Sequence, residues 1–129
     1  MQKKKLIKIM EFIEESTCDS KYTYYCGYGT LIGTIREKGL IPWDEDCDIW
    51  VPITYYDEFI DRLKQKNNGS FSVLSRVDED YSHLFSRVVV KGDNHLKTSV
   101  DIFPLVGISE NKVMQKKFII KSKFIFKFY

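Results

Sequence analysis

The sequence is organised around residues 41–52, which read Ile41-Pro42-Trp43-Asp44-Glu45-Asp46-Cys47-Asp48-Ile49-Trp50-Val51-Pro52. The second half of this run predicts a strand over residues 46–51 that ends at Pro52, because proline cannot donate to a sheet ladder. Asp46 and Asp48 stand two residues apart, so both carboxylates project from one face of that strand. Their mutual repulsion requires a positive partner, and a divalent cation such as Mg²⁺ can bind two carboxylates at once.

Asp101 is a further acidic residue of interest, because it interrupts the otherwise apolar strand pattern Ser99-Val100-Asp101-Ile102-Phe103-Pro104. A carboxylate in a buried strand needs a cation, a hydrogen-bond donor or an exposed edge. An isolated acidic pair is more often a solvated turn, but the apolar neighbours Ile49 and Val51 favour a strand here. We therefore expect Asp101 to join Asp46 and Asp48 in one metal site.

The glycine turn Gly27-Tyr28-Gly29-Thr30 precedes a short predicted helix and is typical of a generic phosphate site. Backbone N–H groups near Gly29 and the hydroxyl of Thr30, the expected N-cap, would face the phosphate. Arg36 and Lys38 lie on or just after this helix and are candidate partners for phosphate groups, although either could be a surface charge.

The remaining periodicity predicts an α+β domain with a mixed sheet flanked by helices. A helix near the N-terminus carries its apolar residues at helical spacing, and the later strands are separated by turn residues. The expected elements are a helix over residues 3–15, a strand over 22–26, a helix over 30–36 that stops at Gly39, a strand over 46–51, a helix capped by Thr54 that ends in the turn at 67–70, and strands over 71–77, 84–90 and 98–103.

Residues 108–129 are biased towards Phe, Ile and Lys, and the sequence leaves their structure open. The run from Phe118 to Tyr129 fits an edge strand whose lysines oppose aggregation. It also fits the arbitrary end of a truncated reading frame.

The length and composition indicate a single domain over residues 1–129. The charge balance gives information about possible partners. Lys and Arg number 20 against 18 Asp and Glu, so the net charge of +2 gives no support for a nucleic-acid partner. The basic residues concentrate at the two ends, which allows at most a peripheral contact with an anionic membrane. His83 and His95 have no metal-binding spacing and receive no role.

The three cysteines form neither a C-x-x-C motif nor an even disulfide framework, which favours a reducing compartment. Cys47 faces away from the two neighbouring aspartates and is expected in the core. Glutamates interrupt the apolar residues near the N-terminus, and the sequence has no apolar run of about 20 residues. We expect a cytoplasmic protein, with any membrane contact at the inner face.

Two ordered blocks make the sequence recognisable. The first is Gly29-Thr30-Leu31-Ile32-Gly33-Thr34-Ile35-Arg36-Glu37-Lys38-Gly39-Leu40-Ile41-Pro42-Trp43-Asp44-Glu45-Asp46-Cys47-Asp48-Ile49, and the second is Val100-Asp101-Ile102-Phe103-Pro104-Leu105. The first resembles the pattern G-G-T-L-L-G, an arginine, K-G-F-I-P-W and D-D-D-I-D-I of the LicD family, which includes the fukutin-type proteins. The second is similar to a later block of the same family. The resemblance covers residues 24–63 and 98–107.

The resemblance implies a nucleotidyltransferase-like fold in which Asp46 and Asp48 bind Mg²⁺ or Mn²⁺ and Asp101 is the third carboxylate of a catalytic site. It implies metal-dependent transfer of a phospho-alcohol such as phosphocholine from a CDP-linked donor to a sugar of a cell-surface polysaccharide or lipopolysaccharide. Asp101 is also expected to accept the proton of the attacking sugar hydroxyl. A second enzyme hypothesis is nucleotidyl transfer with release of pyrophosphate.

The sequence departs from the family pattern at three positions and in length. Tyr28 stands where the pattern has the first glycine of its pair, Glu45 replaces an aspartate and Cys47 an isoleucine. Family members are commonly longer, so the resemblance implies a truncated domain. The alternative function is therefore a catalytically silent fragment, or half of a split protein that a C-terminal chain completes.

Overall fold

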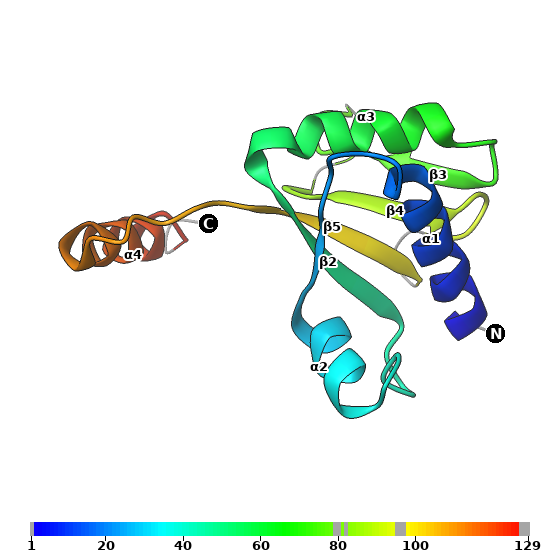
Figure 1. Ribbon diagram of the computed structural model, residues 1–129, viewed down its shortest axis with the longest axis horizontal. Coiled ribbons are helices and arrows are strands. Elements are labelled where there is room, and N and C mark those ends of the chain that lie inside the picture. Colours follow the sequence, from blue (N-terminus) through cyan, green and yellow to red (C-terminus); the bar gives the residue numbers. More distant parts are fainter. Residues whose placement is uncertain (1, 79–80, 82, 95–97, 127–129) are drawn as a thin grey trace.

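The computed structural model describes residues 2–78, 81, 83–94 and 98–126, and within this part the chain forms a five-stranded mixed sheet with helices (Figure 1). This architecture confirms the expected α+β class. The strands are β1 (Tyr25–Cys26), β2 (Asp46–Pro52), β3 (Phe71–Leu74), β4 (Ser86–Val90) and β5 (Ser99–Leu105). The helices are α1 (Gln2–Thr17), α2 (Tyr28–Arg36), α3 (Tyr56–Lys66) and α4 (Lys112–Phe126), with a 3-10 turn, η1 (Ile53–Tyr55), before α3.

The strand order β1-β2-β5-β4-β3 places the two acidic strands side by side at the centre of the sheet. β2 and β5 are parallel and pair Asp48 with Asp101, whereas the other neighbouring strands are antiparallel. α3, β3 and β4 lie between β2 and β5 in the sequence, and a connection of this length is what parallel pairing requires.

One face of the sheet is buried under α1 and α3, and this layer holds the hydrophobic core. β2 alternates between the two faces, with Cys47, Ile49 and Val51 fully buried and the residues between them more exposed. Cys47 is fully buried, which confirms the prediction of a core cysteine, and this burial raises the pKa of its thiol to about 12. Because side chains alternate along the strand, Asp48 and Trp50 lie on the opposite face of the sheet.

Tyr56 joins α3 to the sheet through a fully buried hydroxyl. This hydroxyl donates to the backbone carbonyl of Ile102 on β5 and accepts from the backbone N–H of Ser86 on β4 at 2.8 Å. Both backbone groups lie inside the core, where an unpaired polar group is costly. A single side chain therefore fixes the position of β4 beside β5.

β1 is shorter than the predicted strand over residues 22–26. Its register with β2 continues towards Pro52, which has no N–H to donate. The backbone of Thr23 pairs instead with the hydroxyl of Tyr55, to which it donates its N–H and from which it accepts a hydrogen bond. β3 also stops early, at Leu74, because the next N–H, that of Ser75, donates to the carboxylate of Asp78 in a turn.

Both predicted N-caps are wrong. α2 begins after Gly27 and not at Thr30, and α3 follows η1 with Tyr55 at its N-cap position and no side-chain capping bond from Thr54. At the other end of α2 the left-handed residue is Lys38, with φ of 57°, while the Gly39 N–H donates to the Gly33 carbonyl. The left-handed turn that ends α2 therefore lies at Lys38, one residue before the predicted glycine stop.

Residues 112–126 form helix α4, so the edge-strand interpretation of the C-terminal segment is wrong. Asn111 caps the helix, because its side-chain oxygen accepts hydrogen bonds from the N–H groups of Val113 and Met114. The two edges of the sheet are β1 and β3, and α4 lies apart from both (Figure 1). None of the described helices combines the length and apolar composition needed to cross a membrane.

We expect Tyr56→Phe to lower the free energy of unfolding by about 1–3 kcal/mol, because it leaves a buried N–H and a buried carbonyl without their partner. Tyr55→Phe removes a hydroxyl that also serves two backbone groups, but these hydrogen bonds are exposed to solvent, so it should cost only about 0.5–1 kcal/mol. Urea denaturation of both variants measures the difference. Equal losses would contradict the bridging role of Tyr56.

Candidate metal site

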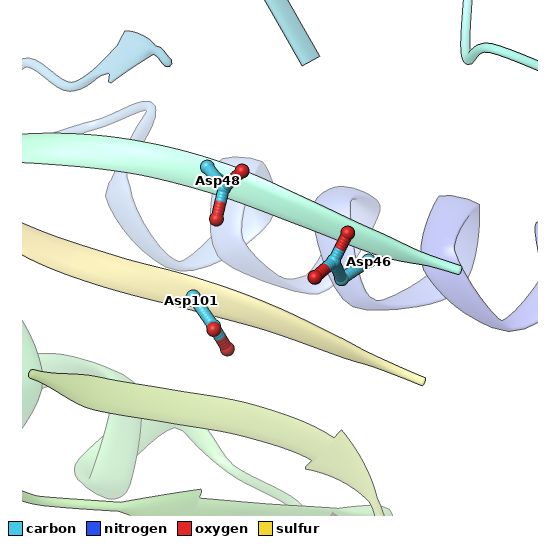
Figure 2. Close-up of side chains that lie close together, drawn as sticks. All are labelled: Asp46, Asp48 and Asp101. Carbon is cyan, nitrogen blue, oxygen red and sulfur yellow. The ribbon is translucent and has the colours of Figure 1, made fainter. Parts of the chain in front are cut away.

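Three carboxylates converge on the open face of the sheet. Asp46 and Asp48 project from β2 and Asp101 from β5, and each offers an oxygen atom within 4.8 Å of the others (Figure 2). No other such cluster is found among the described residues. The structure thus brings together the three side chains that the sequence singled out, through strand alternation and the parallel register of Asp48 with Asp101.

Asp101 is 5% exposed and is held by a partly buried arginine that the sequence analysis did not identify. The Arg87 guanidinium on β4 donates through Nε to Oδ1 at 2.6 Å and through Nη2 to Oδ2 at 2.7 Å. The hydroxyl of Ser99 is 3.1 Å from Oδ1 and also donates to it. Arg87 pairs with Asp101 in the β4–β5 register, so the sheet itself sets this contact. In the sequence, the one sign of this role was that Arg87 is a charged residue within an otherwise largely apolar strand, where it needs a partner.

Among the described residues, Asp46 and Asp48 have no ion pair comparable to that between Asp101 and Arg87. Partial burial, followed by repulsion from Asp46, Asp101 and Asp44, raises the pKa of Asp48 to about 6. Burial and the charge of Asp44 also raise the pKa of Asp46. Arg87 compensates one carboxylate, and the others remain crowded. This is an electrostatic environment that favours binding of a cation.

The oxygen atoms fit a hard divalent cation. In an octahedral Mg²⁺ site, metal–oxygen distances of about 2.1 Å place ligand oxygens about 3–4 Å apart. The separations in the cluster, all within 4.8 Å, need only small side-chain adjustments to reach that range. The donors are all carboxylate oxygens, the ligand type that Mg²⁺ and Mn²⁺ prefer.

The start of α2 holds the backbone of Asp48. The Asp48 N–H donates to the Thr30 hydroxyl oxygen at 2.8 Å, and the Gly27 N–H donates to the Asp48 carbonyl at 2.9 Å. Thr30 is buried, so its hydroxyl serves the strand and does not face solvent. The glycine turn therefore fixes the position of a candidate metal ligand, and its predicted contact with phosphate stays a prediction.

The carboxylate of Asp44 occupies the space beside Gly29. A Cβ atom built on Gly29 would lie 2.7 Å from Asp44 Oδ2, so only glycine fits without a shift. A carboxylate at the first turn of a helix is favoured by the helix dipole. Asp44 thus takes the place at this helix start where a phosphate was expected.

Arg36 and Lys38 lie at the far end of α2. Arg36 is seven positions after Gly29, which corresponds to about 10 Å along a helix. Arg36 forms an ion pair with its exposed neighbour Glu37 at 2.7 Å. The structure does not bring these two basic residues to the first turn of α2, and their role as phosphate ligands stays a prediction. His95 lies outside the described residues.

Tyr28 has φ of 42°, in the left-handed region that favours glycine. This conformation explains why a glycine suits the position in the related pattern. The side chain is 59% exposed, and its ring lies edge-on to Trp50 at 5.3 Å and to Phe103 at 5.8 Å between centroids. Tyr28 therefore points away from the carboxylates and along the sheet.

The fold and the site define an α+β domain that displays clustered carboxylates on the open face of a mixed sheet. Residues 21–129 match the family described as LicD/FKTN/FKRP, nucleotidyltransferase domain. The chain belongs to the LicD family.

One relative illustrates the similarity. The lipopolysaccharide cholinephosphotransferase LicD of Haemophilus influenzae is 33% identical over 72 residues, which are 56% of this chain and 27% of the relative. The chain thus spans about a quarter of the length of that relative in the aligned part.

We expect Arg87→Met to lower the free energy of unfolding by about 3–5 kcal/mol, because it leaves the buried Asp101 carboxylate without its partner. Lys64→Met removes an ion pair with Asp78 that is substantially exposed, and should cost at most about 1 kcal/mol. Chemical denaturation of the two variants tests this contrast. A loss for Arg87→Met as small as that for Lys64→Met would contradict the structural role of the pair.

We expect the stability difference between Asp48→Asn and the parent protein to depend on pH in a metal-free buffer. The folded-state pKa of Asp48 is about 6, above the ordinary value of 3.8, so its protonation stabilises the fold below pH 3.8 and this contribution is lost as the pH rises through 6. The melting temperature of the variant, relative to that of the parent, should therefore rise between pH 4 and pH 7. A constant difference across this range would show that Asp48 is not crowded by its neighbours.

Proposed function

We propose that this domain carries out metal-dependent transfer of a phospho-alcohol, such as phosphocholine, from a CDP-linked donor to a sugar of a cell-surface polysaccharide or lipopolysaccharide. The observation that carries the proposal is the convergence of Asp46, Asp48 and Asp101 on one face of the sheet. Membership of the LicD family and the similarity to a cholinephosphotransferase support the choice of reaction.

Asp46, Asp48 and Asp101 would hold Mg²⁺ or Mn²⁺, which when bound supplies positive charge for the donor phosphates. The protein's own contribution is to position these groups. Thr30 and Gly27 fix the backbone of Asp48, and Arg87 fixes the carboxylate of Asp101 through both oxygens. Preorganised carboxylates avoid the cost of reorienting them when the donor binds.

The site also constrains where the donor can lie. Asp44 occupies the start of α2, so an anionic donor is repelled from the glycine turn unless a cation lies between them. Both carboxylate oxygens of Asp101 accept hydrogen bonds from Arg87. Fewer lone pairs therefore remain for the expected role of Asp101, which is to accept the proton of the sugar hydroxyl. We place the donor on the open face of β2 and β5, beside the carboxylates.

The compartment and the partners of the chain follow as proposals. A CDP-alcohol is the donor and a glycan the acceptor, and the reaction takes place in the cytoplasm with at most peripheral contact with the membrane. The lysines at Lys112, Lys116, Lys117 and Lys121 on α4 would support such contact with anionic lipids. No nucleic acid is involved.

Calorimetric titration of CDP-choline in the presence and absence of Mg²⁺ tests donor binding, and release of CMP in the presence of a glycan acceptor tests transfer. Binding should require the metal and fall at least about tenfold in Asp46→Asn and Asp48→Asn, since each variant removes one anionic metal ligand. Glu45→Gln, an exposed neighbour outside the cluster, should bind as the parent does.

Other outcomes of these assays would support one of the alternative hypotheses or refute the proposed site. Pyrophosphate release from a nucleoside triphosphate would support the nucleotidyl-transfer hypothesis. Metal-dependent donor binding without CMP release would support the fragment or split-protein hypothesis. Donor binding that is unaffected by metal and by both aspartate substitutions would refute the proposed site.

A further inference from the structure

Helix α2 turns its apolar side towards solvent. Four large residues at the spacing of one helical face, between 42% and 68% exposed, form a stripe along it, called here the α2 stripe: Tyr28, Leu31, Ile32 and Ile35. The buried residues of the helix are instead Thr30 and Gly33. A surface helix ordinarily packs its apolar stripe against the core. The α2 stripe is therefore a surface that calls for a partner.

The contacts on the inner side of α2 hold the helix in this orientation. A Cβ atom built on Gly33 would lie 2.6 Å from the carbonyl oxygen of Gly39 and 3.1 Å from the side chain of Ile41. Thr30 accepts a hydrogen bond from the backbone N–H of Asp48. Because the inner side has room only for small residues, rotation of the helix cannot bury the α2 stripe. Any partner must come from outside.

The α2 stripe continues into an apolar pocket of about 650 Å³. The Tyr28 ring lies edge-on to Trp50 and Phe103, and all three residues line this pocket. Leu105, the last residue of β5, lines the pocket as well and is partly exposed. A contiguous exposed apolar surface of this kind marks an interaction site more often than an isolated exposed residue does.

Helix α4 carries further exposed apolar residues and lies apart from the sheet and from α2 (Figure 1). Met114 and Phe118, four positions apart, share one face of the helix, whereas Val113 and Ile120 lie on another. All four side chains are more than half exposed. Residues 106–111, which connect β5 to α4, can span up to about 20 Å when extended. The helix is therefore an arm that can reach a second molecule.

The charge of α4 is complementary to that of the surface around the α2 stripe. No acidic residue occurs in α4, and its side chains that the structure describes include four lysines: Lys112, Lys116, Lys117 and Lys121. Lys117 lies three positions after Met114, in the neighbouring row of the helix surface. The start of the α2 stripe adjoins Asp44, whose carboxylate lies beside Gly29. Opposite charges at the borders of two apolar surfaces favour their association.

The distribution of apolar residues on α4 favours a protein partner over a lipid surface. The lysines alone would suit anionic lipids. A helix that lies in a lipid interface presents one apolar face, however, and the exposed apolar residues of α4 occupy more than one. Apolar residues on several faces are typical of a helix that packs against protein on more than one side.

We propose that α4 of one copy of this chain docks on the α2 stripe of a second copy, and that the two copies exchange these helices reciprocally. Each copy supplies both an arm and a surface for the arm of its partner, so the exchange closes into a symmetric dimer. Exchange of an identical element is a low-cost route to dimers. This inference concerns an association surface and does not depend on the proposed reaction.

Sedimentation velocity of the full chain from about 1 to about 200 µM tests the proposal, and a monomer–dimer equilibrium is expected. Two double variants, Ile32→Ser/Ile35→Ser and Met114→Ser/Phe118→Ser, should each raise the dissociation constant of the dimer at least about tenfold. Their melting temperatures at low protein concentration should stay near that of the parent, because all four side chains are exposed. Val77→Ser, at an exposed position outside α2 and α4, should dimerise as the parent does.

A mixture of the two double variants tests which surfaces meet. In an exchanged pair made of one copy of each variant, one of the two docking contacts remains intact. Mixed dimers should therefore form at lower concentration than the dimers of either variant alone. A Met114→Ser/Phe118→Ser variant that dimerises as the parent does would show that α4 takes no part, and would overturn the proposal.

Disulfide formation separates exchange between copies from closure within one chain. In a Cys18→Ser background, oxidation of an Ile35→Cys/Phe118→Cys variant should link two chains. A link within a single chain would show that α4 folds back on its own α2, and would overturn the exchange. So would a chain that stays monomeric over the whole concentration range, whether or not it binds vesicles of phosphatidylcholine and phosphatidylglycerol.

Discussion

The ion pair between Arg87 and Asp101 is the interaction on which the site depends. The parallel register of β2 and β5 sets Asp48 opposite Asp101, and a sheet with two facing carboxylates at its centre is destabilised unless one of them is compensated. β4 supplies the compensation from the neighbouring strand, at 2.6 and 2.7 Å. With Asp101 neutralised, the sheet can display further acidic residues on β2 without losing its central pairing.

The two faces of the sheet have different compositions: one packs against helices in the hydrophobic core, and the other is open and carries the candidate site. The face under α1 and α3 is closed by apolar packing and by the Tyr56 hydroxyl, whereas the other face presents carboxylates followed by aromatic rings. Because successive residues of β2 serve opposite faces, the same seven residues contribute to both layers. Insertion of a single residue into β2 would exchange the core residues with the candidate metal ligands.

The sequence was sufficient for features that follow from strand alternation, and insufficient for those that depend on partners distant in the chain. The spacing of Asp46, Asp48 and Cys47 predicted their faces correctly, and an acid inside an apolar strand predicted that Asp101 needs a partner. Arg87 was missed because its role follows from the strand order. The C-terminal helix was missed because its Phe, Ile and Lys pattern has no single period, whereas the Asn111 cap starts a helix locally.

The contact between Gly29 and Asp44 links two positions that are far apart in the sequence. Since a Cβ atom at position 29 would collide with the carboxylate at position 44, each residue limits what the other can be. Among homologous chains, a larger residue at position 29 should therefore occur only with a shorter or differently directed residue at position 44. An alignment would record this steric exclusion as covariation between two columns, and that signal would mark how closely α2 approaches the loop that leads into β2.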